Sequence, residues 1–178
     1  MLLYRDGDAG AFDVLYRRHK GGLYRYVLRH CRDAAAAEEL FQDVWTNLIR
    51  ARAGYAVTAK FTTYLYRLAH NRLIDHYRKH GHTVAASFDD EDCEELANLP
   101  DERERPQEVA LDAQRQAKQL LALIAELPAP QREAFVLQQE GGMTVEEIAQ
   151  ATGVTRETAK SRLRYAMAKL RRGMGEWR

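Results

Sequence analysis

The chain has 178 residues, of which 46% are hydrophobic and 30% charged, a balance typical of folded proteins. The formal net charge of +1 conceals an uneven pattern: residues 1–80 carry 14 basic against 8 acidic side chains, residues 81–110 carry 2 against 10, and residues 111–178 carry 11 against 8. There is no apolar run of about 18 residues, no secretory signal and, with two cysteines, no disulfide framework, so we expect a cytoplasmic protein.

Three long helices are predicted in the basic N-terminal part, because apolar residues recur there at intervals of three and four. The first runs from about Phe12 to Val27. Asp33 is a suitable N-cap for the second, whose apolar stripe extends from Leu40 to Ile49. After a loop around Ala53-Gly54-Tyr55, the third runs from about Phe61 to Lys79.

The acidic middle of the chain, residues 81–107, is predicted to be a flexible linker, since like charges at this density disfavour compaction. Such a tether imposes little order on the two parts that it joins, residues 1–80 and residues 108–178. The sequence therefore predicts no fixed placement of one part relative to the other.

Four further helices are predicted after the linker. The helical period returns from Val109 to Ile124, and three shorter helices follow at about 130–139, 144–152 and 155–172. No strand-like alternation or internal repeat stands out. The fold class indicated is all-α, with two small helical domains joined by an acidic linker.

The last two helices have the features of a helix-turn-helix motif. Thr144 and Glu147 are spaced as a capping box, and Gly153 suits a tight turn with positive φ. One face of the final helix is small and apolar and consists of Ala159, Leu163, Ala166 and Leu170. The opposite face is basic and consists of Arg156, Lys160 and Arg164. Such a helix fits the major groove of DNA, whereas the alternative is a solvated basic face.

The third helix combines aromatic and basic residues on one surface, which suits single-stranded or opened DNA because charge holds phosphates while rings stack on bases. The residues of this surface are Tyr64, Arg67, Asn71 and Arg78, with Lys60, His70, Arg72 and Tyr77 among those around them. Packing of the aromatic rings in a core is the alternative. The outer face of the second helix is instead acidic and polar, so it fits a basic protein partner or solvent; it consists of Glu38, Glu39, Gln42 and Asp43.

Taken in order, these segments resemble a bacterial RNA polymerase sigma factor of the sigma-70 family, and more narrowly its extracytoplasmic-function (ECF) group. Residues 12–18 are similar to the opening helix of region 2, residues 37–45 to the segment that grips the clamp helices of the polymerase β′ subunit, and residues 61–75 to the −10 segment. Residues 127–135 and 158–163 are similar to parts of region 4.

The resemblance implies a non-enzymatic factor that directs promoter-specific transcription initiation. Its expected partners are core RNA polymerase, through the β′ clamp helices and the β flap, promoter DNA, and an anti-sigma factor. The implied site residues are Glu38, Glu39, Gln42 and Asp43 for core polymerase; Lys60, Tyr64, Arg67, Asn71, Arg72 and Arg78 for the −10 element; and Arg156, Glu157, Thr158, Lys160, Ser161 and Arg164 for the −35 element.

By the same analogy, Asn71 and the loop from Arg52 to Lys60 would hold a base flipped from the non-template strand. Three positions depart from the family's usual pattern, which has tryptophan, glycine and valine where this chain has Tyr64, Glu157 and Ala159. The last two affect the expected −35 sequence more than the expected function.

Two rival readings of the sequence remain. The first is a metal or redox site, because His70, His76, His80 and His82 cluster near the end of the third helix and Cys93 follows; surface histidines on a basic helix are the favoured interpretation, and no cofactor or metal is expected. The second is a helix-turn-helix regulator that binds duplex DNA without polymerase. No phosphate-binding loop or nucleophile motif indicates an enzyme.

Overall fold

The computed structural model describes residues 1–31, 33–79 and 107–175, and all regular structure within them is helical. The elements are α1 (Leu2–Arg5), α2 (Gly10–Leu28), α3 (Ala34–Arg50), a 3-10 turn η1 (Arg52–Gly54), α4 (Phe61–Lys79), α5 (Gln107–Ala125), α6 (Ala129–Gly141), α7 (Val145–Thr152) and α8 (Arg156–Gly175). The all-α prediction is confirmed, and only the short α1 was not expected. Residues 81–106 of the predicted linker lie outside the described residues.

The N-terminal unit, α1 to α4, is a helical bundle with an aromatic-rich core. Asp33 caps α3 as predicted, accepting hydrogen bonds at 3.1 Å from the backbone N–H groups of Ala35 and Ala36. Trp45 on α3 packs edge-on against Tyr16 of α2, with ring centroids 5.0 Å apart. Ile49 is an exception to the predicted apolar stripe: it follows the buried Leu48 by about 100° around the helix, and is 44% exposed.

The C-terminal unit, α5 to α8, contains the predicted helix-turn-helix. Both hydrogen bonds of the capping box are present: the Thr144 N–H donates to Glu147 Oε2 at 2.9 Å, and the Glu147 N–H donates to Thr144 Oγ1 at 3.3 Å. Gly153 has φ of +69°, a conformation that L side chains rarely adopt. The four inward residues predicted on α8 are all buried, so its opposite face is the one left outside.

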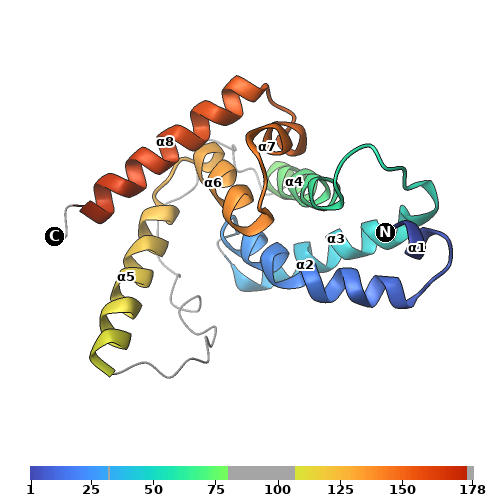
Figure 1. Ribbon diagram of the computed structural model, residues 1–178, viewed down its shortest axis with the longest axis horizontal. Coiled ribbons are helices and arrows are strands. Elements are labelled where there is room, and N and C mark those ends of the chain that lie inside the picture. The colour runs from blue at the N-terminus through green and yellow to red at the C-terminus, as the bar shows by residue number, and fades with distance from the viewer. Residues whose placement is uncertain (32, 80–106, 176–178) are drawn as a thin grey trace.

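The two units pack directly against each other, although the sequence predicted no fixed placement. Figure 1 shows α7 beside α4, and α6 lies against both α2 and α4. Glycines allow this approach: a Cβ atom on Gly22 of α2 would lie 3.1 Å from the Glu140 carbonyl oxygen, and one on Gly141 would lie 3.2 Å from Tyr66 of α4. Buried side chains of both units, such as Tyr66 and Leu137, therefore belong to one continuous core.

None of the helices in the described parts of the chain is long and apolar enough to cross a membrane.

A buried histidine at the end of α2 predicts how stability depends on pH. His30 is enclosed by protein and its Nδ1 lies 2.7 Å from the Tyr26 carbonyl oxygen. Burial lowers the pKa of its imidazole below the ordinary 6.5, partly opposed by the charge of Glu133. The unfolded chain therefore binds more protons below pH 6.5, and stability that is complete above this pH is lost as the pH falls.

We expect the free energy of unfolding to drop between pH 6.5 and 5.5, and His30 can contribute at most about 1 kcal/mol to this drop, because one proton of difference costs about 1.4 kcal/mol per pH unit. Urea denaturation at several pH values measures this slope. In His30→Gln the slope should be shallower, with a remainder from the half-buried His19, whose pKa burial also lowers. Equal slopes in both proteins would contradict the assignment to His30.

Candidate DNA and polymerase interfaces

An open pocket of about 530 Å³ lies between α4 and the loop that follows α3. Three of the predicted −10 residues line it from α4, namely Tyr64, Arg67 and Asn71. The loop contributes the opposite wall with Ala51, Gly54, Tyr55, Ala56 and Thr58. The structure therefore brings Asn71 together with the loop that the resemblance implied, around a space with one amide, one guanidinium and aromatic surface.

Tyr55 forms a wall of this pocket that the sequence did not predict. Its ring is buried and meets the Tyr64 ring edge-on, with centroids 5.1 Å apart. Arg5, at the end of α1, donates from Nη1 to the Tyr55 carbonyl oxygen at 3.3 Å and so ties the loop to the N-terminus. An aromatic residue in an otherwise small and polar loop was the available signal. Tyr64 is thereby fixed but half-exposed, so one part of its ring can stack on a base.

The other predicted −10 residues lie outside the pocket. Lys60 pairs with Glu147 of α7, with Nζ 2.8 Å from Oε1. Arg72 points toward α3 and lies 3.7 Å from an Asp43 carboxylate oxygen. Arg78 is exposed near the end of α4, with Nη1 3.9 Å from Asp75 Oδ1. Arg72 thus belongs to the α3–α4 contact and not to the pocket.

Two residues next to the predicted DNA-facing surface of α4, His70 and Tyr77, also make hydrogen bonds or ion pairs within the protein. His70 Nδ1 lies 2.7 Å from Glu133 Oε1 of α6, and the Tyr77 hydroxyl donates to the His30 carbonyl oxygen. Both had been expected to surround the DNA-facing surface. His70 is held by α6 of the C-terminal unit and Tyr77 by the end of α2, so neither is free to bind DNA in this arrangement. Helical spacing does not distinguish an exposed face from one that a neighbouring helix covers.

The acidic face of α3 is exposed over three of its four predicted residues, Glu38, Glu39 and Gln42. Gln42 Nε2 donates to Glu38 Oε1 at 3.0 Å. Next to this face, a second open pocket of about 360 Å³ is lined by Glu39, Asp43 and residues of α4 such as Arg72 and His76. The face is therefore continuous with a groove of mixed charge between α3 and the end of α4.

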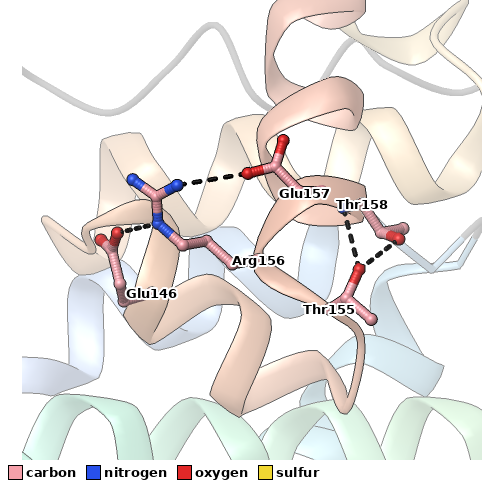
Figure 2. A network of polar contacts seen from close by, with 5 residues as sticks. All are labelled: Glu146, Thr155, Arg156, Glu157 and Thr158. Atoms are coloured by element: carbon pink, nitrogen blue, oxygen red, sulfur yellow. Dashed lines mark hydrogen bonds and ion pairs between the residues drawn. The ribbon is translucent and has the colours of Figure 1, made fainter.

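The start of α8 is organised by a polar network that Figure 2 shows. The Arg156 guanidinium is held by the Glu146 carboxylate of α7 and lies 3.3 Å from Glu157 Oε1. Thr155 acts as the cap: its Oγ1 accepts from the Thr158 N–H at 3.2 Å and lies 2.8 Å from the Thr158 hydroxyl. Arg156, Glu157 and Thr158 are thus oriented by one another and by α7 before any ligand arrives.

Farther along α8, the predicted basic face is open. Lys160 and Arg164 are exposed and Ser161 is half-exposed. The Arg164 guanidinium lies over the ring of Tyr165, 5.0 Å from its centroid. Tyr165, not singled out from the sequence, is 54% exposed and adds an aromatic surface beside the basic one.

The histidine cluster does not form a metal site in the part that the structure describes. Within those residues, no three His, Cys, Asp or Glu side chains are grouped so that they could hold an ion. His80, His82 and Cys93 lie outside them. Burial raises the pKa of the Cys31 thiol to about 12, so this group stays protonated and unreactive at neutral pH.

Comparison with known protein families accounts for both units. Residues 15–83 match the family model described as Sigma-70 region 2, and residues 117–170 match the one described as Sigma-70, region 4. Among curated proteins, the chain is 28% identical to the RNA polymerase sigma factor CarQ of Myxococcus xanthus, over 99% of this chain and 96% of CarQ. It is 29% identical to the ECF RNA polymerase sigma factor SigM of Mycobacterium tuberculosis, over 95% of this chain and 80% of SigM.

Solved structures show the same fold. The sigma factor RpoE of Bartonella quintana, crystallised with the anti-sigma factor NepR, superposes with a TM-score of 0.69 at 20% identity, covering 94% of this chain and 99% of RpoE. CnrH, solved with the cytosolic domain of CnrY, gives a TM-score of 0.65 at 20% identity, covering 98% and 94%.

A helical unit that matches region 2, followed by a DNA-binding helix-turn-helix that matches region 4, defines a transcription initiation factor and not an enzyme. The chain belongs to the sigma-70 family of RNA polymerase sigma factors, in its extracytoplasmic-function group.

Proposed function

We propose that this sigma factor uses its two units, residues 1–80 as region 2 and residues 108–178 as region 4, for separate tasks in promoter recognition by bacterial RNA polymerase. The N-terminal unit binds core polymerase and holds the opened −10 element. The C-terminal unit reads the duplex −35 element. The cytoplasm, where the polymerase works, is the proposed location.

The observation that carries this proposal is the pocket between α4 and the loop after α3. It gathers an amide, a guanidinium and a half-exposed ring from Asn71, Arg67 and Tyr64. An unstacked base needs such groups: hydrogen-bonding partners for its edge, an aromatic face, and positive charge for the neighbouring phosphates. In this proposal Asn71 contacts the base, Tyr64 stacks and Arg67 holds the backbone.

The −35 element is assigned to the exposed face of α8. Lys160 and Arg164 extend from one side of the helix toward solvent, and Arg156 is presented at its start by Glu146. Arginine side chains fixed in this way suit bidentate contacts with guanine edges in the major groove, while lysine suits phosphates. Glu157 and Thr158 complete the first turn, and Ser161 lies between the basic residues.

A partner that covers both units is also proposed. RpoE of Bartonella quintana forms a complex with the anti-sigma factor NepR, and this chain shares the RpoE fold at a TM-score of 0.69. An anti-sigma factor for this chain would use the surfaces offered to polymerase, of which the acidic face of α3 is one.

Run-off transcription tests the proposal as a whole. The purified chain is added to bacterial core polymerase on a library of genomic promoters, and start sites that share a −35 and a −10 sequence are the expected result. A chain that binds duplex DNA but neither pulls down core polymerase nor starts transcription would instead be a helix-turn-helix regulator.

Charge reversal on α3 tests the polymerase contact separately. Glu39→Lys is expected to weaken binding to core polymerase about tenfold, because an exposed ion pair contributes about 1 kcal/mol and reversal adds repulsion. Glu39 is preferable to Asp43, since reversal of Asp43 would also disturb its contact with Arg72 inside the fold. Affinity is measured by fluorescence anisotropy of the labelled chain titrated with core polymerase.

The matched control is Glu126→Lys, which makes the same charge change at an exposed position at the end of α5. It should leave the affinity for core polymerase within twofold of the original chain. Equal weakening by the two variants would mean that net charge, and not the α3 face, determines binding.

A further inference from the structure

The pocket proposed to hold the flipped base, here called the base pocket, has one wall from the regular helix α4 and one from a loop. Residues 55–60 of that loop belong to no helix, and within residues 51–60, all of which the structure describes, Tyr55 alone is buried. The other loop residues that line the pocket are small and exposed, namely Ala51, Gly54, Ala56 and Thr58. Such side chains do not hold a loop in one conformation, so the position of this wall depends on what fixes Tyr55.

Tyr55 is fixed from two sides. Its ring packs against Tyr64 of α4, and its carbonyl oxygen accepts the hydrogen bond that Arg5 of α1 donates from Nη1 at 3.3 Å. This hydrogen bond is partly buried and joins residues that are 50 positions apart in the chain. It therefore connects α1 to the loop at the one residue that forms the buried part of the wall.

α1 is itself held against the aromatic core, so it can act as a fixed support. Tyr4 is buried, with its ring 5.2 Å from that of Phe12, which in turn meets Trp45 edge-on at 5.8 Å. The Arg52 guanidinium of η1 lies over the Tyr4 ring, 5.1 Å from its centroid. α1 thus contacts the start of the loop through Tyr4 and the wall of the pocket through Arg5, in keeping with its place beside η1 (Figure 1).

We propose that α1 braces the loop wall of the base pocket, with Arg5 as a positioning residue that acts through Tyr55 when promoter DNA is opened. This inference rests on the base pocket of the proposed function and adds to it a segment from outside the pocket. Arg5 does not line the pocket itself, so its effect on a base is indirect. A flipped base binds best when both walls are already in place, because ordering the loop on binding would cost conformational entropy.

Arg5→Ala tests the brace, because it removes the hydrogen bond to Tyr55 and leaves every side chain of the pocket unchanged. Arg17→Ala is the matched control. The Nε of Arg17 also donates to a backbone carbonyl at 3.3 Å, that of Asp13, but this bond lies within α2. Both substitutions therefore remove one positive charge and one hydrogen bond of the same kind. Circular dichroism confirms that each variant retains its helices.

Transcription from two templates separates bracing from a general loss of function. The first template is a duplex with a promoter that run-off transcription has mapped for this chain with core polymerase. The second keeps the non-template strand but has a mismatched template strand, so that the −10 region is already open. Arg5→Ala is expected to reduce transcription about fivefold on the duplex, as one partly buried hydrogen bond would. On the open template the loss should be less than about twofold, because opening no longer depends on capture of the base.

Hydrogen exchange of the full chain, followed by mass spectrometry, measures the brace without DNA. Peptides that cover residues 51–60 should exchange faster in Arg5→Ala than in the original chain, since the loop loses one of its two attachments. In Arg17→Ala the exchange of these peptides should be unchanged. This measurement remains valid even if no promoter is found.

A loss confined to the duplex template, together with faster exchange of the loop, supports the proposal. Equal loss on both templates, equal loss in the two arginine variants, unchanged exchange of the loop, or unchanged transcription in Arg5→Ala would overturn it. Asn71→Ala is measured on the duplex in parallel, and if it retains full transcription, the assignment of the base pocket itself fails. The two failures are distinguishable because a failed brace leaves the loss in Asn71→Ala intact.

Discussion

Replacement of Arg132 by methionine is expected to lower the free energy of unfolding by about 3–5 kcal/mol. Arg132 is 1% exposed at the start of α6, and its guanidinium donates to carbonyl oxygens at the end of α5. Nε donates to Ile124 at 3.0 Å, and Nη2 donates to Leu127 at 3.0 Å and to Ala125. The Ile124 carbonyl also accepts from the Leu127 N–H at 3.2 Å, so the carbonyls of Ala125, at the end of α5, and of Leu127, in the connection to α6, depend most on the guanidinium. Each buried acceptor left without a donor costs about 1–3 kcal/mol.

Methionine preserves most of the volume and removes all the donors, so the loss reports the hydrogen bonds and not a cavity. The measurement is chemical denaturation followed by circular dichroism. Arg171→Met, on an exposed part of α8, is the control and should change stability by less than about 0.5 kcal/mol. A loss below about 1 kcal/mol in Arg132→Met would mean that water or a rearranged loop replaces the guanidinium.

Replacement of Asn71 by alanine is expected to reduce transcription from the chain's own promoters ten- to a hundredfold. In the proposed site its amide hydrogen-bonds the edge of the flipped base, and one well-placed amide contributes about 1–3 kcal/mol of discrimination between bases. The side chain is exposed at the rim of the pocket, so the substitution should leave stability within about 0.5 kcal/mol. Run-off transcription and thermal denaturation together measure the two effects.

Arg67→Ala separates base recognition from general affinity for DNA. Because Arg67 is assigned to the phosphate backbone, its loss should weaken binding to all single-stranded sequences alike and reduce the dependence of binding on salt. Asn71→Ala should instead weaken only the preferred −10 sequence. If both variants lose affinity equally on preferred and random sequences, Asn71 does not read a base.

The helices and their faces follow from local sequence, and the structure confirms nearly all of them. The N-cap at Asp33, the capping box of Thr144 with Glu147 and the left-handed Gly153 each depend on residues within a few positions of one another, so spacing alone predicts them. The exception at Ile49 arises at the edge of a stripe, where periodicity does not fix how far the neighbouring helix reaches.

The candidate sites were predicted less completely, because their composition depends on loops and on contacts between the units. The sequence placed Asn71, Tyr64 and Arg67 together, and the resemblance added the loop from Arg52 to Lys60. Neither singled out Tyr55 within that loop as a wall of the pocket, nor predicted that Arg72 would turn toward Asp43. Successive residues of an α-helix point about 100° apart, so a residue at the border of a face can contact either of two adjacent elements. Only the packed structure decides which element it contacts.

By itself, the sequence determined the all-α class, the helix-turn-helix and the resemblance to the sigma-70 family, since each rests on short-range patterns in a fixed order. The tertiary structure alone decided how the two units meet. That contact joins His70 to Glu133 and Arg25 to Glu140, pairs 63 and 115 residues apart in the chain. The contact depends on charge complementarity and on the close approach that Gly22 permits. Neither produces a periodic pattern in the sequence, so neither could be predicted from it.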